Sequence, residues 1–344
     1  MKKLKIKSTI GTSEIFVGES LANVSNYLPK GKKIAIITDP VIYSLYGDKF
    51  PKSDLVIEIP RGEAHKSLQS LDDIFEKLIE AEFDRTSFIL GIGGGIVCDM
   101  SGFIATIFMR GIEFGFVSTT LLSQVDASVG GKNGVNFRGY KNMIGTFSLP
   151  RFVICELNIL RSLPAHELLS GMGEVIKHGA IASESLFSYI ERHLDALQKY
   201  DATVLETFVY ESIVIKSSIV SSDVKESGAR RIFNFGHTFG HAIEKITKMP
   251  HGYAVSVGMA MAAKLSVLKG KMKQNECDRL LALLTATGLP TTCDARNEDI
   301  LEAMKCDKKR DGDGIHFVYL LGIGSCCVEK LSYAEIATYI NDLR

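Results

Sequence analysis

The sequence predicts an α/β protein in which a doubly wound parallel sheet forms the first half and helices form most of the second. Three observations carry this prediction. Short β-branched runs alternate with helical patterns in the first half, one of these runs leads directly into three consecutive glycines, and β-rich runs become scarce after about Pro164. Strands and helices that alternate at this spacing are typical of a parallel sheet with a helix in each crossover.

Four runs in the first half predict buried strands, because they are short and rich in apolar and β-branched residues. They are residues 33–38 (KIAIIT), 55–60 (LVIEIP), 87–92 (SFILGI) and 114–118 (FGFVS). Residues 40–50 are expected to form a short helix. Apolar residues at helical spacing from Leu68 to Ile79 predict a longer one. A further helix of small and apolar residues is expected to follow Gly95.

The second half favours helix over residues 165–200, 202–222, 238–249 and 253–271. Two short strands are expected at 315–321 and 326–330. Met259 and Met261 are interpreted as helix core rather than as part of a cofactor site. We therefore divide the chain into an α/β domain at 1–162 and a mostly helical domain at 163–344, with the cleft between them as the expected ligand site.

Length and composition exclude several classes of protein. The 344 residues suggest about two domains. Forty Lys and Arg residues balance forty Asp and Glu residues, so no overall field attracts nucleic acid or an anionic membrane. No apolar run approaches the roughly 18 residues that span a bilayer, and Lys7, Ser8 and Thr9 interrupt any signal core near the start. The seven cysteines show no C-x-x-C spacing. A soluble cytoplasmic protein with reduced thiols is expected.

The glycine-rich segment 91–99 (GIGGGIVCD) has the context of a phosphate-binding turn, namely a strand, then glycines, then the start of a helix. Glycines let backbone N–H groups approach a pyrophosphate, and the helix N-terminus adds positive potential. The segment does not match the strict G-x-G-x-x-G pattern, because Ile96 or Cys98 occupies the third glycine position. A tight turn without a ligand is the alternative, but three glycines at a strand end favour nucleotide binding.

Three of the eight histidines, His237, His241 and His251, lie within fifteen positions among glycines. His237 and His241 are four residues apart, so on a helix they share one face, which suits a zinc ion. Glu174 could supply a carboxylate. The alternative is that these histidines cap helices or fill polar core positions. The pattern alone does not determine which two histidines bind a metal, and it favours His237 with His241.

Basic residues also occur in glycine-rich or apolar surroundings, where free surface charges are uncommon. They are Arg110, Lys132, Lys141, Lys177, Lys216, Arg230, Lys308 and Lys309. Gathered in one cleft, these groups would hold a small molecule with several negative charges. Zero net charge with a basic cleft indicates a small anion rather than a nucleic acid.

Five motifs together closely resemble the 3-dehydroquinate synthase family of sugar-phosphate cyclases. They are GGGIVCD (93–99), TTLLSQVDASVGGK (119–132), KNMIG (141–145), GEVIK (173–177) and GHTFGHA (236–242). The resemblance extends from about residue 61 to 309. The family is similar in fold to polyol and iron-dependent alcohol dehydrogenases. The resemblance implies that the first domain binds NAD, that the second domain binds metal and substrate, and that the protein is a homodimer.

The resemblance implies a lyase of the shikimate pathway, in which aromatic amino acids are made. The substrate would be 3-deoxy-D-arabino-heptulosonate 7-phosphate, and the products 3-dehydroquinate and phosphate. The implied steps are transient oxidation by NAD, β-elimination of phosphate, reduction, ring opening and an intramolecular aldol closure. Three rival functions remain: another sugar-phosphate cyclase, a polyol dehydrogenase that uses NAD and a metal, or a nucleotide-binding regulator without catalytic activity.

The family pattern also implies roles for individual residues. One divalent ion, Zn²⁺ or Co²⁺, would bind Glu174, His237 and His251. Substrate-contacting positions match Asp126, Lys132, Asn142, Lys177, Lys216, Arg230, Asn234, His241 and Lys308, and Arg110 matches a position that reaches across a dimer interface. NAD-contacting positions match Asp39, Glu63, Lys66, Gly94, Gly95, Asp99, Thr119, Thr120, Lys132, Lys141 and Ser162.

The chain departs from the usual family pattern in a few places. Tyr253 stands where Glu usually follows His-Gly, Cys98 and Tyr140 replace glycines, and Arg161-Ser162 replaces a common Lys-Thr. The segment between His237 and His251 is also shorter than in many members. None of these changes removes an implied metal ligand or phosphate-binding lysine.

Overall fold

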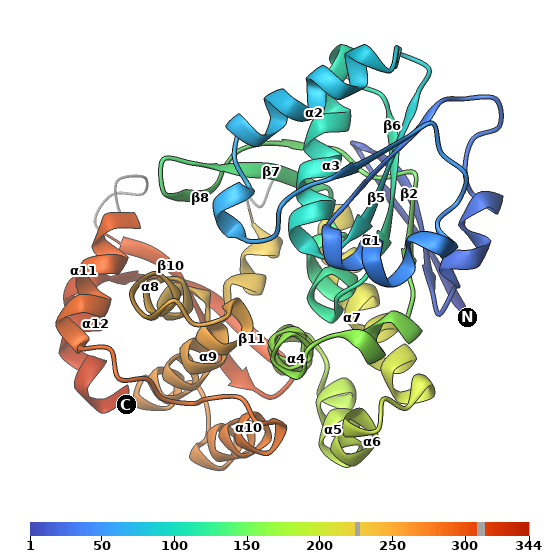
Figure 1. Ribbon diagram of the computed structural model, residues 1–344. Helices are drawn as coiled ribbons and strands as arrows, with labels where there is room; N and C mark the ends of the chain where they lie inside the picture. Colours follow the sequence, from blue (N-terminus) through green and yellow to red (C-terminus); the bar gives the residue numbers. More distant parts are fainter. Residues whose placement is uncertain (224–227, 308–313, 344) are drawn as a thin grey trace. The chain divides into compact units, whose positions relative to one another are not determined.

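The computed structural model describes residues 1–223, 228–307 and 314–343 (Figure 1). The chain forms two compact units. The first comprises Met1–Leu163 and Leu205–Lys225, and the second comprises Pro164–Val204 and Glu226–Arg344. Most of helix α7 (Ala202–Ser222) therefore belongs to the first unit, whereas the sequence analysis groups this segment with the second half.

The first unit is built on a seven-stranded sheet in the order β1-β2-β9-β6-β5-β3-β4. Its strands are β1 (Lys2–Ser8), β2 (Gly11–Val17), β3 (Ile34–Thr38), β4 (Leu55–Glu58), β5 (Phe88–Gly93), β6 (Glu113–Ser118) and β9 (Phe152–Cys155). Only β1 pairs antiparallel to its neighbour, and the other pairs are parallel. The predicted doubly wound sheet is thus confirmed, and β3 to β6 coincide with the four predicted runs.

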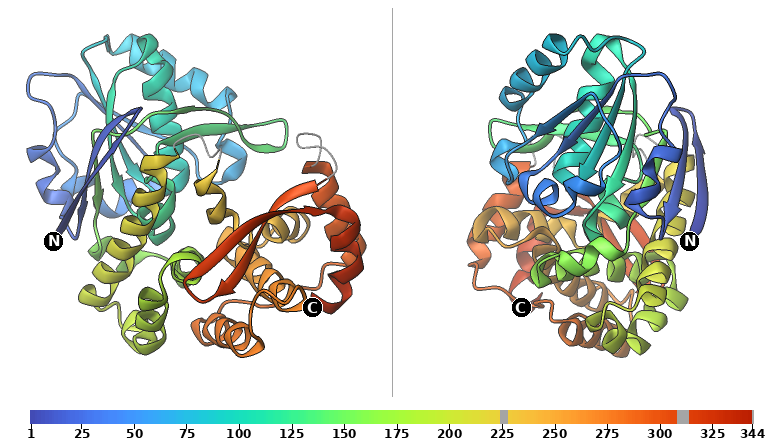
Figure 2. Two further views of the ribbon diagram at one scale, coloured as in Figure 1. Left: turned by 180° about the vertical axis from the view of Figure 1, so that it is seen from behind. Right: turned by 45° about the vertical axis from the view of Figure 1, so that its right-hand side comes forward.

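Both faces of this sheet are buried, which explains why its central strands read as continuous apolar runs. Phe88, Leu90 and Ile92 of β5 point to a core shared with α1 (Pro40–Tyr46). On the other face, Gly91 lies against Ser101 of α3 (Gly95–Ile107). Helix α2 (Gln69–Glu80) runs beside α3 on this face (Figures 1 and 2). Helices on opposite faces leave the strand ends open for a site.

A two-stranded hairpin of β7 (Lys132–Phe137) and β8 (Tyr140–Phe147) packs on α3. The sequence analysis predicts neither this hairpin nor strands β1, β2 and β9. The hairpin strands are rich in Gly, Asn and Lys, which are depleted in strands, and β1 alternates lysines with apolar residues at the sheet edge. These elements are therefore held by tertiary packing rather than by local propensity.

The second unit is mostly helical, as predicted. Its helices are α4 (Ala165–Ala182), α5 (Glu184–Arg192), α6 (Leu194–Gln198), α8 (His237–Thr247), α9 (His251–Leu268), α10 (Gln274–Thr287), α11 (Asn297–Asp307) and α12 (Tyr333–Tyr339). The long helical region predicted over 165–200 is broken at Ser183, whose side chain caps α5, and again at His193. The two short strands predicted near the C-terminus are β10 (Gly314–Gly322) and β11 (Ser325–Ser332), and the structure pairs them antiparallel.

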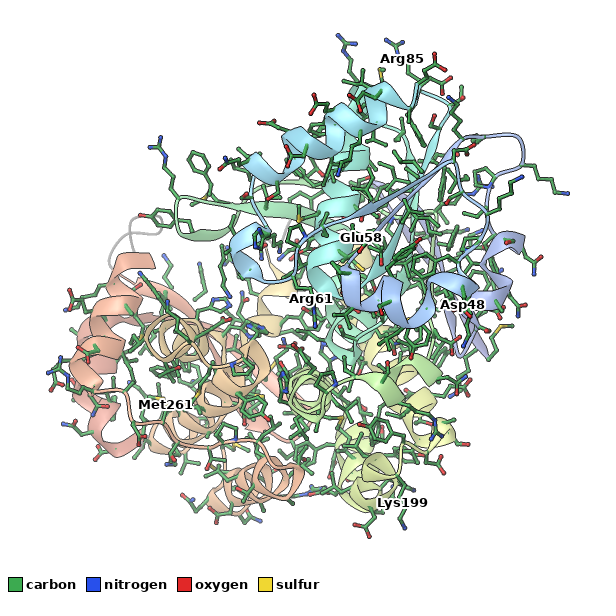
Figure 3. The ribbon with its side chains drawn as sticks, in the orientation of Figure 1. Asp48, Glu58, Arg61, Arg85, Lys199 and Met261 are labelled. Carbon is green, nitrogen blue, oxygen red and sulfur yellow. The ribbon has the colours of Figure 1, made fainter. Side chains whose placement is uncertain are left out.

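Helix α9 is the central helix of this unit and is buried along most of its length. Met259 and Met261 are 0% and 2% exposed, so their interpretation as helix core is confirmed; Figure 3 labels Met261 among the surrounding helices. Strand β10 runs along α9 (Figure 2). The backbone N–H of Leu320 donates to the Ser266 hydroxyl at 3.1 Å.

Among the residues that the structure describes, no helix combines the length and the apolar character that crossing a bilayer requires. Of the cysteines whose side chains the structure describes, Cys98, Cys155, Cys277, Cys293, Cys326 and Cys327 form no disulfide.

Candidate active site

The glycine turn of the first unit lies where the order of the parallel strands reverses. From β3 the chain moves outward to β4 and then returns to place β5 on the other side of β3. In open α/β sheets, ligands bind beyond the carboxyl ends of the strands at such a point. Gly93 ends β5 there, and Asp39 directly follows β3. Asp39 and the glycine turn that follows Gly93 therefore lie at the expected edge of the sheet.

The N-terminus of α3 is suited to bind an anion. Gly94 is its N-cap, and no side chain accepts from the first N–H groups of the helix. A Cβ added at Gly94 would lie 3.0 Å from Cγ2 of Thr120, and one at Gly95 would lie 3.2 Å from Cβ of Ala127. Larger side chains would thus crowd the turn. The free N–H groups and the helix dipole provide a place for a phosphate.

Asp39 caps the neighbouring helix α1. Its Oδ1 accepts hydrogen bonds from the backbone N–H groups of Val41 and Ile42 at 3.0 and 3.2 Å. Arg61, which follows β4, places its Nε 3.8 Å from the same oxygen (Arg61 is labelled in Figure 3). Asp39 is 8% exposed. Its carboxylate is therefore fixed at the end of β3, where a ribose hydroxyl is bound in folds of this type.

Lys66 and Asp99 form a nearly buried ion pair beside the glycine turn. Lys66 Nζ lies 2.5 Å from Oδ2 of Asp99, and the two side chains are 5% and 17% exposed. Burial raises the pKa of Asp99, and the Lys66 ammonium opposes that shift. The ion pair therefore fixes the orientation of both side chains.

The remaining candidate cofactor positions lie on loops and on the hairpin. Thr119 and Thr120 follow β6, and the Thr119 N–H donates to the carbonyl of Gly93 at 3.0 Å. Lys141 lies on β8 and is exposed. Ser162 lies at the end of the 3₁₀ turn Asn158–Ser162, where its hydroxyl accepts from Tyr46 at 2.7 Å. Glu63 is exposed in the loop after β4.

In the second unit, Glu174 of α4, His237 of α8 and His251 of α9 direct their donor atoms toward one point. Nε2 of His237 is 3.6 Å, and Nε2 of His251 is 3.7 Å, from Oε1 of Glu174. These distances are too long for hydrogen bonds. Two ligands that each lie about 2.1 Å from a tetrahedral Zn²⁺ are about 3.4 Å apart. The separations therefore fit a shared metal ion better than direct contact.

Two glycines allow close packing between the elements that carry these three residues, helices α4, α8 and α9 (the helices are labelled in Figure 1). A Cβ at Gly252 of α9 would lie 1.9 Å from the carbonyl oxygen of Ser170 in α4. A Cβ at Gly258 would lie 2.0 Å from the carbonyl oxygen of Gly236, which precedes α8. Any side chain at either position would push two helices apart. The glycines therefore set the spacing of Glu174, His237 and His251.

Both imidazoles are held through their other nitrogen. Nδ1 of His251 lies 3.2 Å from Oε2 of Glu244, and Nδ1 of His237 lies 3.2 Å from the carbonyl oxygen of Phe235. Metal-binding histidines commonly donate their second N–H in this way, which fixes the tautomer and orients the ring. Each ring therefore presents Nε2 toward Glu174.

The protonation states of Glu174, His237 and His251 also suit the binding of a cation. Burial lowers the pKa of His237 well below its ordinary value, and the nearby Lys177 ammonium lowers it further, so this ring is neutral. Burial acts in the same direction on His251, but the carboxylates of Glu174 and Glu244 outweigh it and raise its pKa to about 9. Burial also acts to raise the pKa of Glu174, but Lys177 and the histidines hold it well below the ordinary range. A divalent cation would take the place of the proton that His251 retains.

His241 lies close to Glu174, His237 and His251, but it is not part of the group whose donor atoms converge. Its ring centroid is 5.0 Å from that of His237 and 6.0 Å from that of His251, and the side chain is exposed. The geometry therefore favours His251 over His241 as the second imidazole ligand, although the sequence spacing favours His241.

The second unit also contains the candidate substrate residues Lys177, Arg230 and Asn234. Lys177 is 1% exposed, pairs with Glu174 one turn earlier, and lies 5.9 Å from the ring centroid of Phe233. Arg230 is 3% exposed, and Asn234 is half-buried; both lie on the 3₁₀ turn Ala229–Asn234, which leads toward α8. Lys308 and Lys309 lie outside the described residues.

In the first unit, Lys216 of α7 pairs with Asp126. Its Nζ contacts the Asp126 carboxylate and donates to the backbone carbonyl of the same residue at 2.5 Å. Asp126 lies in the π-helical turn Ser123–Ala127, a type of distortion often found at functional sites. Lys132 and Asn142 lie on the hairpin and are exposed. Arg110 is exposed in a turn after α3.

The departures from the family pattern have simple structural consequences. Cys98 is completely buried in the first turns of α3. Tyr140 lies on β8, and the positive φ angles of the hairpin turn fall on Arg138 and Gly139 (47° and 83°) instead. Tyr253 is half-buried in the first turn of α9. The shortened connection before His251 contains Lys248 in a left-handed conformation (φ 60°) at the end of α8.

Two residues next to the site were not identified from the sequence. Glu244 lies three residues after His241 on α8, so helical spacing could have placed it on the histidine face. Asn136 lies on β7, where its amide contacts two candidate site residues. No local pattern in the sequence marks this asparagine.

Comparison with known proteins identifies the relatives of the chain. Residues 56–170 match the family model described as 3-dehydroquinate synthase N-terminal, and residues 171–310 match 3-dehydroquinate synthase C-terminal. The 3-dehydroquinate synthase of Saccharophagus degradans is 41% identical over 333 residues, which cover 92% of each chain. The synthase of Pyrococcus abyssi is 41% identical over 323 residues, covering 91% of this chain and 93% of its own length.

Solved structures share the fold over the whole chain. A 2-deoxy-scyllo-inosose synthase complexed with carbaglucose-6-phosphate, NAD⁺ and Co²⁺ has a TM-score of 0.89 and 27% identity, covering 99% of this chain and 100% of that one. The 2-epi-5-epi-valiolone synthase of Streptomyces hygroscopicus, with NAD⁺ and Zn²⁺ bound, has a TM-score of 0.87 and 24% identity, covering 100% and 98%. An iron-containing alcohol dehydrogenase shares the fold at a TM-score of 0.66 and 13% identity, covering 98% of each chain.

Proposed function

The chain belongs to the 3-dehydroquinate synthase family, and from this premise we propose that it converts 3-deoxy-D-arabino-heptulosonate 7-phosphate to 3-dehydroquinate and phosphate. The reaction would proceed through transient oxidation of a ring hydroxyl, β-elimination of phosphate, reduction, ring opening and intramolecular aldol closure. The sequence relatives support this substrate over those of other cyclases, because the structural neighbour 2-deoxy-scyllo-inosose synthase is 27% identical, whereas the dehydroquinate synthases are 41% identical.

The proposal includes NAD and one divalent ion, Zn²⁺ or Co²⁺. When bound, NAD supplies a hydride acceptor that is regenerated in each turnover, and the metal ion polarises substrate hydroxyls. Glu174, His237 and His251 would hold the ion, since their donor atoms converge at suitable separations. The N-terminus of α3 would bind the cofactor pyrophosphate, and Asp39 a ribose hydroxyl. The structures of two neighbours with NAD⁺ and Co²⁺ or Zn²⁺ support this cofactor pair.

The proposal that the substrate has several negative charges is supported mainly by the burial of cationic side chains. Lys177, Lys216 and Arg230 are 1%, 6% and 3% exposed. Buried cations are rare unless they are paired, because their desolvation is costly. Lys177 and Lys216 are paired with the carboxylates of Glu174 and Asp126. These residues would orient a phosphate and a carboxylate and stabilise the charge that develops as phosphate leaves. A neutral polyol would not require such groups.

We also propose that the protein is a homodimer in which Arg110 reaches the partner subunit. Met109, Arg110 and Gly111 have successive positive φ angles of 49°, 68° and 116°. Non-glycine residues adopt this conformation at a cost and often do so at functional sites. Ile107 and Met109, at 39% and 42% exposed, add apolar surface beside Arg110. Sedimentation velocity should give a dimer that Met109→Asp weakens; a monomer at micromolar concentration would contradict this proposal.

A cytoplasmic location belongs to the same proposal. The six cysteines whose side chains are described form no disulfide, and two of them are adjacent in β11, which suits a reducing compartment. Recovery of the protein with cytosolic markers in cell fractionation would support this location, whereas recovery with secreted or membrane proteins would contradict it.

A substrate comparison tests the proposed reaction. Metal-loaded protein and NAD⁺ are incubated separately with heptulosonate phosphate, with phosphorylated sugars that lack a carboxylate, and with simple polyols, and the products are identified by mass spectrometry. Formation of 3-dehydroquinate from the first substrate alone is the expected result. Cyclisation of a sugar without a carboxylate would assign the protein to another cyclase activity. Oxidation of polyols with release of NADH would assign it to the dehydrogenases.

A further inference from the structure

The hairpin that carries Lys132, Lys141 and Asn142 is distorted opposite Asn136. Val135 pairs with Ile144, but the next pair along the hairpin is Phe137 with Tyr140. Asn136 on β7 therefore faces residues 141–143 on β8, so that β8 has two extra residues. Bulges of this kind redirect side chains and are frequent next to active sites. The bulge contains Asn142, whose φ of 50° is in the left-handed region.

The Asn136 side chain satisfies the backbone of this bulge. Its Oδ1 accepts a hydrogen bond from the N–H of Asn142 at 2.8 Å. A residue in a bulge has lost its partner in the ladder, and the side-chain oxygen replaces that partner. Because the hydrogen bond is made to the backbone of Asn142, it favours the left-handed conformation that aims the Asn142 carboxamide.

The other end of the same amide holds Glu63. Nδ2 of Asn136 donates to Oε1 of Glu63 at 2.8 Å and to the Glu63 carbonyl at 3.3 Å. The orientation of the amide is unambiguous, since an N–H group requires the oxygen and a carboxylate requires the nitrogen. The backbone N–H of Asn136 also donates to the carbonyl of Lys66 at 2.8 Å. Asn136 thus fastens the loop at 63–66 to the hairpin.

Lys66 completes a closed ring of contacts. Its Nζ donates to Oδ1 of Asn142 at 2.5 Å and pairs with Asp99. Asn142 is consequently held at its backbone by Asn136 and at its carboxamide by Lys66. All of these residues except Asn136 are assigned a role at the proposed cofactor or substrate site.

We propose that Asn136 is a positioning residue that fixes the substrate-contacting Asn142 and the NAD-contacting Glu63 relative to each other. This inference rests on the proposed function. The two ends of the amide have different roles: Oδ1 sets the conformation of Asn142, and Nδ2 orients the Glu63 carboxylate. Substitutions that remove one end or both ends should therefore affect NAD⁺ and sugar phosphate differently.

Asn136→Ala removes both ends, and Asn136→Asp keeps the acceptor for Asn142 while placing a carboxylate against Glu63. NAD⁺ affinity is measured by calorimetry without substrate, and KM and kcat are measured with saturating NAD⁺. The alanine variant should weaken NAD⁺ binding and lower kcat/KM, each by about tenfold, as expected for lost hydrogen bonds to charged or buried groups. The aspartate variant should weaken NAD⁺ binding by about tenfold, with kcat/KM within about threefold of wild type.

The substitution Glu63→Gln distinguishes the proposed role of Asn136 from a general loss of structure. In the wild type it should weaken NAD⁺ binding, because the substituted side chain lacks the carboxylate charge. In the Asn136→Asp background it should tighten NAD⁺ binding, since the new amide can donate to the aspartate. A change in the same direction in both backgrounds would overturn the proposal.

Asn23→Ala is the matched control, because Asn23 Nδ2 donates to Oε1 of Glu19 at 2.9 Å in the same unit, away from the hairpin. This variant should leave NAD⁺ affinity, kcat and KM unchanged. If Asn136→Ala behaves like this control, the proposal is wrong. If the wild type binds NAD⁺ but forms no 3-dehydroquinate, the proposed function fails, and the sign of the Glu63→Gln effect on NAD⁺ affinity still decides the role of Asn136. A wild type that binds no NAD⁺ would overturn both.

Discussion

Oε2 of Glu244 lies 3.2 Å from Nδ1 of His251, while Nε2 of the same ring faces Glu174. The two carboxylates therefore lie at opposite edges of one imidazole. A metal-binding histidine is commonly oriented in this way by an acceptor on its other nitrogen. This relationship distinguishes His251 from His241, and it leads to the first prediction.

Replacement of Glu244 by Gln should weaken metal binding without removing a ligand. The neutral amide holds the His251 ring less firmly and lowers its basicity, so the affinity for Zn²⁺ should fall by about 10- to 100-fold. Competition with a fluorescent zinc chelator measures this change. Glu298→Gln, an exposed acid on α11 of the same unit, is the control and should bind Zn²⁺ like the wild type. Equal affinities for all three proteins would show that Glu244 has no part in the site.

The two alternative histidines can be separated by metal analysis. His251→Ala should lose the bound metal and the activity, while circular dichroism shows an intact fold. His241→Ala should keep one metal ion per chain and lose activity by about 10²-fold or more, as expected for a group that acts on substrate. Normal metal content in His251→Ala would remove this residue from the ligand set.

Lys132→Ala should affect the sugar phosphate and not the cofactor. Lys132 is exposed on the hairpin. The family pattern matches it to both the substrate and the NAD positions, and we predict that its contact with the anionic substrate is the one that matters for the rate. Loss of a hydrogen bond to a charged group should raise KM or lower kcat by roughly 10- to 100-fold. NAD⁺ affinity, measured without substrate, should stay within error of the wild type. Weaker NAD⁺ binding with unchanged KM would assign Lys132 to the cofactor instead.

Cys98 should be inert despite its position in the first turns of α3. A helix N-terminus lowers the pKa of a thiol, whereas burial raises it. Burial dominates here and raises the pKa of Cys98 to about 12. At pH 8 its thiolate fraction is therefore far below that of an ordinary thiol. Iodoacetamide should alkylate the half-exposed Cys293 in the native protein and Cys98 only after denaturation. Rapid native labelling of Cys98 would contradict this assignment.

The strands of the central sheet could be predicted because both faces of the sheet are covered. Residues 88–93 are all buried, so the run is apolar throughout and easily identified. Strand β1 alternates exposed lysines with apolar residues and gives a much weaker signal. The hairpin β7–β8 gives none, because α3 and a network of polar side chains stabilise it rather than its own residues.

The candidate metal site shows what sequence spacing leaves undetermined. Residues four apart on a helix share a face, which favoured His237 with His241. The separation of Glu174 and His251 depends instead on how closely α9 approaches α4 at Gly252 and Ser170. That approach is a tertiary property of residues more than 80 positions apart. The resemblance to a family supplied the ligand set that spacing could not.

The central claim is that NAD acts catalytically in a reaction without net redox change. The measurement that tests it most directly supplies metal-loaded protein with heptulosonate phosphate in large excess over NAD⁺, and follows phosphate, 3-dehydroquinate and absorbance at the NADH wavelength in one cuvette. We predict equal amounts of phosphate and 3-dehydroquinate, many times the amount of NAD⁺, with no accumulation of NADH. A reaction that stops after one equivalent of NAD⁺ while NADH accumulates would contradict the account.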